Sequence, residues 1–201
     1  MYKRFFKRPA DLLISLGGLL IVSPFLVVAL LFVLWKTREN PFFLQKRPGW
    51  NERIFTLVKM RTMMNTCDAD GTLLPDNDRM TRWGKFLRET SMDEIPQLIN
   101  VLIGDMSLIG PRPLLPEYLP LYSDFQRRRH QVRPGVTGWA QVNGRNSISW
   151  QQKFDLDVWY VEHVSFKTDM RIMLKTFKKV FSKADINRSA GVTMPAFDGT
   201  N

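Results

Sequence analysis

Two neighbouring stretches organise this chain: TSMDEIPQ at residues 90–97 and GDMSLIGPRP at residues 104–113. Ser91 and Glu94 have the S-x-x-E spacing of a capping box, which predicts that a helix begins there. Asp93 would then lie in the first turn, where the positive end of the helix favours an ionised carboxylate by about 0.3–1 kcal/mol. An anionic Asp93 could serve as a nucleophile or a metal ligand. A purely structural role, in which these residues only cap the helix and suit its dipole, explains the same pattern.

The composition indicates one globular domain that binds an anionic partner. With 201 residues, 44% of them hydrophobic, the chain can build one sizeable core. Cys67 is the single cysteine, which excludes an intramolecular disulfide, and two histidines leave no Cys/His zinc site within one chain. A reducing cytosolic face fits this composition. The net charge of +10 points to an acidic membrane surface, a phosphorylated substrate or nucleic acid, and charge alone does not choose among them.

An uncharged run of 24 residues, 12–35, has basic residues on both flanks and predicts a membrane segment. It is too long for a typical signal-peptide core and has no A-x-A-like cleavage site, so we expect it to be retained. Ser23 and Pro24 divide it into equal halves. A proline there removes one helical hydrogen bond and bends the helix, and the Ser23 hydroxyl could satisfy the freed carbonyl. Two topologies remain: a re-entrant helix over residues 1–38 that enters and leaves on one side, and an ordinary kinked spanning helix.

The next forty residues predict a small β-hairpin followed by a surface loop. Two β-prone runs, at 42–45 and 54–58, are separated by the turn-forming sequence RPGWN. Lys59 follows the second run, either as a solvated charge at a strand end or as a phosphate contact. Asp68 begins the sequence DADGT, which matches the D-x-D-G-T of haloacid dehalogenase phosphatases. Because the residues before Asp68 are polar and poor in strand formers, an acidic surface loop is the better interpretation.

Two amphipathic helices are predicted. Over residues 79–88, basic side chains recur every three positions while apolar side chains follow helical spacing on another face, and Arg88 would reach the carboxylates that follow. From Phe166 onward, an apolar stripe is opposed by lysines and an arginine. The first helix could lie at a lipid interface or present a solvated charged face, and the second could rest on anionic lipid or pack in the core. The polar, turn-rich residues 183–201 predict a loosely ordered tail.

A rigid turn follows the central helix. Gly104 should end that helix, and Pro111 and Pro113 fix φ on both sides of Arg112, whose planar guanidinium suits a phosphate or a planar base. A second glycine-rich, charged loop spans 133–145 and is too irregular for a P-loop or a dinucleotide-binding fingerprint. Its glycines could serve only as turns.

Taken together, these motifs resemble the bacterial sugar transferases, which are monotopic phosphoglycosyl transferases. The resemblance covers roughly residues 1–182 and extends to the small form of the family, which initiates bacterial N-linked protein glycosylation. It rests on the re-entrant-like N-terminus, FTLVKMR at 55–61, the pair Asp93 and Glu94, and the segments 104–113 and 133–145, in that order.

The resemblance implies transfer of a phospho-sugar from a UDP-sugar to polyprenol phosphate, giving polyprenyl-diphospho-sugar and UMP, with Mg²⁺ as cofactor. Asp93 would be the nucleophile that forms an aspartyl phospho-sugar, which splits one difficult displacement into two easier ones. Glu94 would bind the metal or position the phosphates. The implied metal ligands are Asp93, Glu94 and Asp157. The implied phosphate and nucleotide contacts are Lys59, Arg88, Pro111, Arg112, Pro113 and Arg145.

The fold implied by the resemblance is an α-rich mixed α/β protein with a re-entrant N-terminal membrane helix, a small β-hairpin and interfacial amphipathic helices around the active site. Residues 39–182 would form a catalytic domain on the cytoplasmic face of the bacterial inner membrane. There a polyprenol phosphate, such as undecaprenyl phosphate, and membrane lipids would meet a soluble UDP-sugar. UDP-N,N'-diacetylbacillosamine is one candidate sugar nucleotide, no nucleic acid is expected, and a homodimer is left open.

Two other functions remain. A membrane-tethered module that binds anionic lipid or nucleic acid would explain the positive charge, but not the acidic pair beside the Pro-Arg-Pro turn. A tethered phosphatase would explain the D-x-D-G-T match and would depend on Asp68 instead of Asp93.

Overall fold

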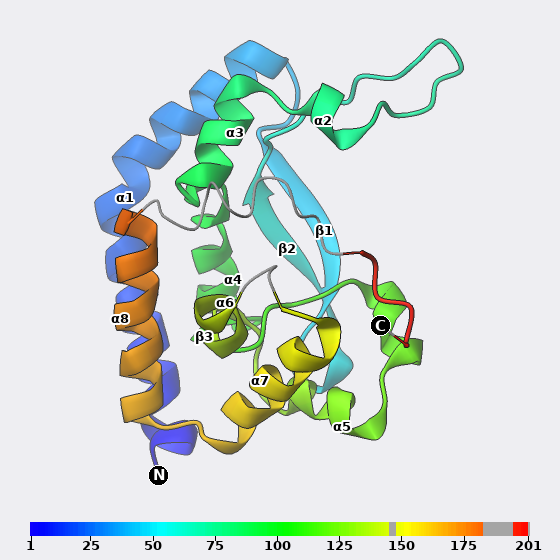
Figure 1. The fold of residues 1–201 in the computed structure, drawn as a ribbon. Coiled ribbons are helices and arrows are strands. Elements are labelled where there is room, and N and C mark those ends of the chain that lie inside the picture. Colours follow the sequence, from blue (N-terminus) through cyan, green and yellow to red (C-terminus); the bar gives the residue numbers. More distant parts are fainter. Residues whose placement is uncertain (145–147, 183–194, 201) are drawn as a thin grey trace.

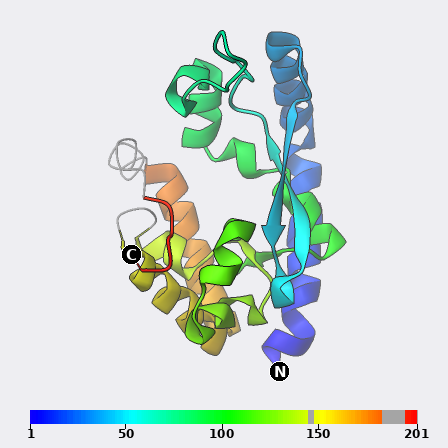
Figure 2. The same cartoon turned by 90° about the vertical axis from the view of Figure 1, so that its right-hand side faces the viewer.

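A long apolar helix runs along one side of the molecule. The computed structural model describes residues 1–144, 148–182 and 195–200. Helix α1 spans Lys7–Thr37 after a π-helical turn, η1 (Tyr2–Phe6), and it follows the edge of the fold in both views (Figure 1, Figure 2). Among the described residues, this is the one helical segment long and apolar enough to cross a membrane. Many of its large apolar side chains are exposed, including Leu13, Leu20, Ile21, Phe25, Val28 and Leu31.

Pro24 lies inside α1, and the residue before it compensates for the lost hydrogen bond. Pro24 has no N–H to donate to the carbonyl of Leu20, and the Ser23 hydroxyl donates to that carbonyl instead, at 2.9 Å. This contact confirms the expectation from the sequence. The helix continues through Pro24 and bends near its middle in the view of Figure 1. A re-entrant course through a membrane stays a prediction.

The predicted hairpin is confirmed, and so is the surface loop that follows it. Strands β1 (Phe42–Pro48) and β2 (Ile54–Met60) pair antiparallel along their full length, joined by a 3₁₀ turn, η2 (Trp50–Glu52). Farther on, Asp68 is exposed, and one of its carboxylate oxygens accepts two backbone N–H groups of the same turn. Asp68 therefore organises a surface turn and does not end a buried strand.

The basic helix is shorter than predicted. The expected helix over 79–88 divides into a single turn, α2 (Asp76–Arg79), and a separate helix, α3 (Arg82–Glu89). Thr81 sets the boundary, because its hydroxyl accepts the backbone N–H three residues on, at 2.8 Å. Leu87 is fully buried against the C-terminal half of α1, so α3 lies along the apolar helix.

The helix predicted to begin at Ser91 begins six residues later. Ser91 has a φ of 56° and its side chain caps nothing, so the predicted capping box is wrong. A 3₁₀ turn, η3 (Met92–Glu94), precedes α4 (Gln97–Ile103). Pro96 has no N–H and cannot continue a helical hydrogen-bond ladder from Ser91, but it suits the start of a new helix. Gly104 ends α4 with a φ of 111°, as predicted.

A pair of short parallel strands carries the Pro-Arg-Pro turn. Strand β3 (Ser107–Ile109) pairs with β4 (Gly135–Thr137) and leads directly into the turn that contains Arg112. The two backbones are very close where the strands meet: a Cβ on Gly135 would lie 2.0 Å from the nitrogen of Gly110. The glycines therefore allow this close approach, a role beyond the turns expected from the sequence.

The remaining elements cover the strands and complete the core. They are η4 (Pro116–Leu121), α5 (Asp124–Arg127), η5 (Arg128–Gln131), α6 (Trp139–Asn143), α7 (Trp150–Glu162) and α8 (Phe166–Ser182). One hydrophobic cluster contains Phe154 of α7 and Phe197, which is 4% exposed. The segment 195–200 thus packs on α7, which differs from the loose tail predicted for 183–201; residues 183–194 lie outside the described chain.

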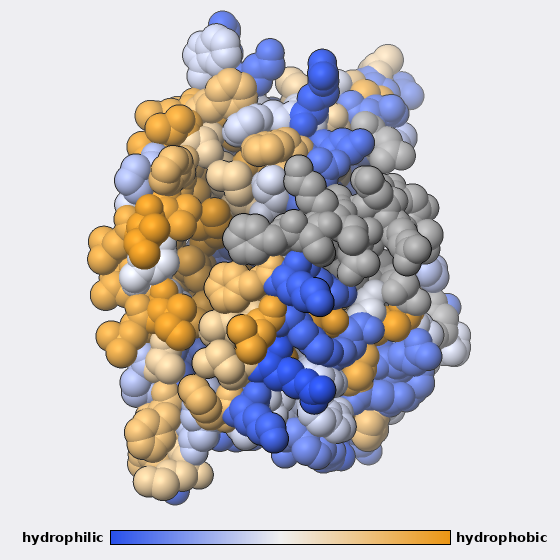
Figure 3. Space-filling model, turned by 60° about the vertical axis from the view of Figure 1, so that its left-hand side comes forward, coloured by the Kyte–Doolittle hydropathy of each residue, from blue (hydrophilic) through white to orange (hydrophobic). Residues whose placement is uncertain are grey.

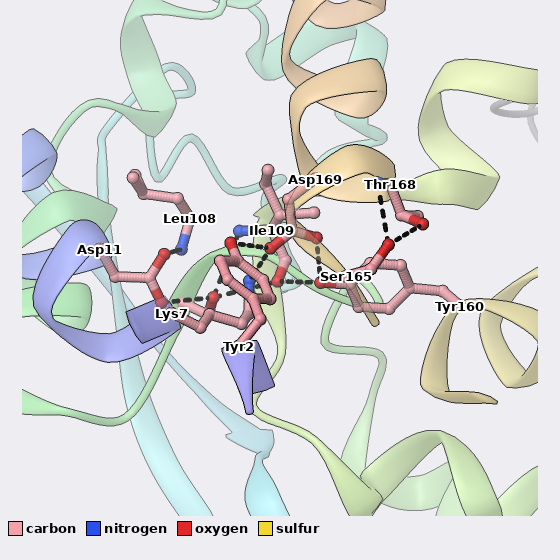
Figure 4. Close-up of polar contacts among 10 residues, drawn as sticks. Tyr2, Lys7, Asp11, Leu108, Ile109, Tyr160, Ser165, Thr168 and Asp169 are labelled. Atoms are coloured by element: carbon pink, nitrogen blue, oxygen red, sulfur yellow. Dashed lines mark hydrogen bonds and ion pairs between the residues drawn. The ribbon is translucent and has the colours of Figure 1, made fainter. Parts of the chain in front are cut away.

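Buried polar groups fasten the start of α1 to the rest of the fold (Figure 4). Asp169 of α8 accepts hydrogen bonds from the Tyr2 hydroxyl, at 2.8 Å, and from the Lys7 ammonium, at 2.7 Å. Asp11 of α1 accepts a hydrogen bond from the Ser107 hydroxyl at 2.7 Å. The helix is therefore fixed to α8 and to β3, the strand that precedes the Pro-Arg-Pro turn.

Exposed hydrophobic side chains gather on the side formed by α1 and α8. Phe166, Leu174 and Phe177 of α8 are between 57% and 63% exposed, so this part of the apolar stripe faces outward, while Met173 packs against a core cluster. Figure 3 shows the hydrophobic area beside a hydrophilic one. An exposed apolar area of this kind marks a surface that another phase or molecule covers. Together with the length and hydropathy of α1, it indicates membrane association.

Replacing Ser23→Ala with Pro24→Ala tests the topology. A straight helix would be about 36 Å long at 1.5 Å per residue, enough to cross the hydrocarbon layer. With Cys67 removed, single cysteines near Met1 and in the loop 68–78 should both be protected from an impermeant thiol reagent in intact cells if the parent helix is re-entrant. The double variant should expose part of the Met1 population, because basic residues resist complete translocation. Labelling near Met1 in the parent would instead establish a plain spanning helix.

Candidate active site

Asp93 lies in the wall of a cleft, and its carboxylate has no bonded partner. The left-handed conformation of Ser91 turns the chain into η3, where Asp93 is 8% exposed and lines a cleft of about 1260 Å³. Within the described chain, no group donates a hydrogen bond to this carboxylate and none forms an ion pair with it. The oxygens are therefore available to a molecule bound in the cleft.

Glu94, by contrast, is held by two cations. Its carboxylate accepts a hydrogen bond from Lys59 of β2 at 2.8 Å and a two-pronged contact from Arg112 of the Pro-Arg-Pro turn. Burial alone would raise the pKa of Glu94, but Arg112 and Lys59 outweigh burial and hold that pKa well below its usual range. Glu94 is thus an anion that joins η3, β2 and the turn after β3.

The pKa of Asp93 moves in the opposite direction. Burial raises it, the neighbouring charge of Glu94 raises it further, and Lys59, Arg88 and Arg112 oppose the rise. The sequence predicted that a helix dipole would favour the anion, and this is wrong, because Asp93 lies within a single 3₁₀ turn and not in the first turn of a helix. Asp93 therefore takes up a proton at a higher pH than an exposed aspartate would.

The cleft brings together three of the predicted phosphate contacts. Lys59, Arg88 and Arg112 line it with the acidic pair, and among the described lining residues ten are cationic and five are anionic. Pro111 and Pro113 are buried and hold Arg112 instead of lining the cleft. Arg145, the sixth predicted contact, lies outside the described residues.

The turn that carries Arg112 is held from behind by a buried ion pair. Arg129 donates to the carbonyl oxygen of Arg112 at 2.6 Å. The same guanidinium donates to one oxygen of Asp157 at 2.8 and 3.1 Å, and both side chains are at most 2% exposed. Burial raises the pKa of Asp157, and Arg129 opposes the rise. Asp157 thus acts through Arg129 on the backbone of Arg112.

This pairing bears on the predicted magnesium ligands. The described residues contain no group of three or more His, Cys, Asp or Glu side chains that could hold a metal ion together. One oxygen of Asp157 already accepts both bonds from Arg129, and a place for Asp157 in a ligand set with Asp93 and Glu94 stays a prediction. Magnesium is commonly held by one or two carboxylates together with substrate phosphates and water. Asp93 and Glu94 fit that smaller requirement.

Sequence reasoning missed three cations of this region. Arg129 belongs to the run RRRH at 127–130, which could have drawn attention, although nothing in the run says which arginine is buried. Arg47 of β1 and Lys153 of α7 also line the cleft. The Lys153 ammonium lies 4.3 Å from the centre of the Trp150 ring. Neither position carries a local motif.

Comparison with known proteins identifies the family. Residues 2–183 match the family model described as bacterial sugar transferase. The chain belongs to the bacterial sugar transferase family. It is 48% identical over 194 residues to the uncharacterized sugar transferase EpsL of Bacillus subtilis, with 96% of each chain covered. These matches confirm the resemblance to the bacterial sugar transferases that the sequence motifs indicated.

Two further members of the family have names that state a reaction. The undecaprenyl-phosphate galactose phosphotransferase of Salmonella typhimurium is 36% identical over 197 residues, which cover 90% of this chain and 41% of the relative. The undecaprenyl-phosphate glucose phosphotransferase of Komagataeibacter xylinus is 37% identical over 192 residues, covering 88% of this chain and 36% of the relative. The chain thus spans less than half the length of these two relatives.

Asp157→Asn should lower the free energy of unfolding by about 3–5 kcal/mol, because Arg129 would be left as an unpaired buried charge. Thermal unfolding of the purified protein, without added metal, measures this loss. Asp155→Asn on the same helix is the matched control. Asp155 is exposed and bonds only Gln151 among the described residues, so its change should stay within about 0.5 kcal/mol. Equal stability of the two variants would contradict the structural role of the buried pair.

Proposed function

We propose that this protein transfers a phospho-sugar from a UDP-sugar to polyprenol phosphate, such as undecaprenyl phosphate, giving polyprenyl-diphospho-sugar and UMP. The observation that carries this proposal is the unpaired carboxylate of Asp93 in a cation-rich cleft, beside a Glu94 that is already paired. Both substrates are phosphate anions. The relatives named for galactose and glucose phosphotransfer to undecaprenyl phosphate support the same reaction class.

Asp93 would act as the nucleophile. A carboxylate oxygen of Asp93 bonds to the β-phosphorus of the UDP-sugar, the bond from that phosphorus to the bridging oxygen breaks, and UMP leaves with the electron pair. An oxygen of the polyprenol phosphate then attacks the aspartyl phospho-sugar and releases Asp93. Lys59, Arg88 and Arg112 would offset the charge spread over the phosphoryl oxygens in both steps.

Mg²⁺ belongs to this proposal as a cofactor held mainly by the substrate phosphates. Asp93 and Glu94 are the cleft carboxylates that would complete its coordination. When bound, the ion would supply positive charge at the phosphoryl oxygens. Arg112 and Lys59 would orient the phosphates. Both side chains are themselves held in position by their ion pairs with Glu94.

The site would operate at the surface of a membrane. We assign residues 1–38 to a re-entrant membrane helix and residues 39–182 to a catalytic domain on the cytoplasmic face of the bacterial inner membrane, a monotopic arrangement. A polyprenol phosphate would then keep its chain in the lipid while its head enters the cleft. Assembly of a glycoconjugate, such as a glycan for protein glycosylation, would use the product. An Asp68-dependent phosphatase is disfavoured, because Asp68 is exposed and bonded to its own turn.

Asp93→Asn should lower UMP release from a UDP-sugar and polyprenol phosphate by at least about a thousandfold, because the amide keeps the shape of the side chain but not its nucleophilicity. The variant should remain folded and membrane-bound. UMP release by membranes supplied with a panel of UDP-sugars and Mg²⁺ measures the effect. Asp68→Asn is the control and should retain parental activity. Near-normal turnover in Asp93→Asn, or loss in Asp68→Asn, would overturn the assignment.

Glu94→Gln should reduce turnover about a hundredfold or more, because Lys59 and Arg112 lose the anion that orients them. The measurement is the dependence of UMP release on Mg²⁺ concentration in parent and variant. A shift of this dependence to higher Mg²⁺ would assign Glu94 as a metal ligand. The same Mg²⁺ response at a lower maximal rate would assign it to orienting the two cations, and full activity would contradict both roles.

A further inference from the structure

The buried side chain of Asn100, in α4, bonds a strand instead of its own helix. Asn100 is 1% exposed. Its Nδ2 donates to the carbonyl oxygen of Thr56 at 2.8 Å, and its Oδ1 accepts the backbone N–H of Val58 at 3.0 Å. Both backbone groups belong to β2, which pairs with β1 along its other edge. The Asn100 amide therefore takes the place that a peptide group of a further strand would have beside β2.

The backbone of Asn100 fixes a third part of the chain. Its carbonyl oxygen accepts the N–H groups of Gly104, Asp105 and Met106, at 3.1, 3.0 and 3.2 Å. Met106 is fully buried, and the next residue begins β3, which leads into the Pro-Arg-Pro turn. Through its side chain and its carbonyl, Asn100 thus fastens both β2 and the entry to β3 to α4.

These three segments carry the three members of the ion-pair group beside Asp93. Lys59 directly follows Val58 in β2, Glu94 ends the turn just before α4, and Arg112 lies in the turn after β3. The Lys59 ammonium is 2.8 Å from one oxygen of Glu94, and Arg112 donates to both oxygens. The two cations can meet on one carboxylate only while all three segments keep their relative positions.

We propose that Asn100 is a positioning residue for the transfer reaction: its hydrogen bonds hold β2, α4 and the entry to β3 so that Lys59 and Arg112 meet on Glu94. This inference rests on the proposed function. Asn100 is not among the described residues that line the cleft, so it would act through the ion-pair group without touching a substrate.

Two variants remove the bonds in different ways. Asn100→Leu keeps the approximate size and leaves the Val58 N–H and the Thr56 carbonyl without their partner, which favours a shift of β2. Asn100→Asp keeps an acceptor for Val58 but sets an oxygen against the Thr56 carbonyl, and the Asp105 carboxylate lies 3.5 Å from the replaced nitrogen. Both variants should therefore displace Lys59 from Glu94.

Chemical labelling of Lys59 measures this displacement without any substrate. The purified, membrane-reconstituted protein is treated with an amine-acetylating reagent, and mass spectrometry compares the acetylation rate of Lys59 with that of Lys167, an exposed lysine of α8. We expect both Asn100 variants to raise the relative rate at Lys59 by about fivefold or more, because its hydrogen bond to Glu94 is weakened.

Turnover shows whether Asn100 acts through the ion-pair group. Asn100→Leu should lower kcat for UMP release by about tenfold or more, because small displacements of positioned groups are costly in catalysis. In a protein that already carries Glu94→Gln, the same change should lower kcat by less than about threefold, since both substitutions disturb one assembly. A general structural contribution would lower kcat by the same factor in both backgrounds.

Gln97→Met is the matched control on the same helix. Gln97 is 2% exposed, and its Nε2 has no hydrogen-bond partner in the part of the chain that the structure describes. The control thus removes a buried amide from α4 without removing a bond to β2. It should keep the parental labelling rate at Lys59 and the parental kcat.

Three outcomes would overturn the inference: parental labelling of Lys59 in a folded Asn100 variant, equal losses of kcat in the two backgrounds, or failure of both Asn100 variants to fold. The last would make Asn100 a requirement of the whole fold; if one variant folds, that variant decides. Faster labelling of Lys59 in the variants of a parent that releases no UMP from any UDP-sugar would support the positioning by Asn100 and overturn the proposed function. The two failures are therefore distinguishable.

Discussion

The buried carboxylate of Asp169 is the contact on which the arrangement of this protein depends. It accepts bonds from Tyr2 and Lys7 at the start of the apolar helix, and the Tyr160 hydroxyl of α7 lies 2.8 Å from its other oxygen (Figure 4). A buried ion pair contributes little net free energy, but removing one partner leaves a costly unpaired charge. Any arrangement of α1 that separated Lys7 from Asp169 would carry that cost. These contacts therefore hold the start of the apolar helix against α7 and α8.

Strand β3 connects these contacts at the start of α1 to the candidate active site. Asp11, one turn after Lys7, bonds the Ser107 hydroxyl, and β3 runs from Ser107 into the turn that presents Arg112. Glu94 then pairs with Arg112 and with Lys59. The Glu94 carboxylate thus pairs with both Lys59 and Arg112. For this reason the adjacent Asp93 carboxylate has no bonded partner among the described residues, although many cations line the same cleft. The distribution of ion pairs, more than the number of charges, therefore decides which of the two adjacent carboxylates can accept a contact from a bound molecule.

Local features of the chain were readable from the sequence, and long-range ion pairs were not. Gly104 ended its helix, the RPGWN turn formed its hairpin, and the Ser23 hydroxyl reached the carbonyl freed by Pro24, because each depends on residues a few positions apart. The capping box failed because Pro96 interrupts the helical ladder that a cap at Ser91 would need.

The partners of Asp157 and Arg112 could not be read in this way. Arg129 and Asp157 are 28 positions apart, and Arg112 and Glu94 are 18 apart, so no local pattern records either pair. The resemblance to the bacterial sugar transferases indicated which residues belong to the site, but not which of them form ion pairs with one another. The metal-ligand role predicted for Asp157 came from the resemblance, and the structure adds that one oxygen of Asp157 pairs with the arginine that holds the backbone of Arg112.

The position of the cleft follows from the same contacts. Helix α3 forms one wall of the cleft, and its other side packs on α1 through Leu87 and through the ring of Trp83, 4.8 Å from that of Phe32. The cations of that wall therefore lie one helix diameter, roughly 10 Å, from the face of α1 on which α3 packs. On the proposed function, a lipid phosphate enters the cleft along α3 while its chain stays beside α1.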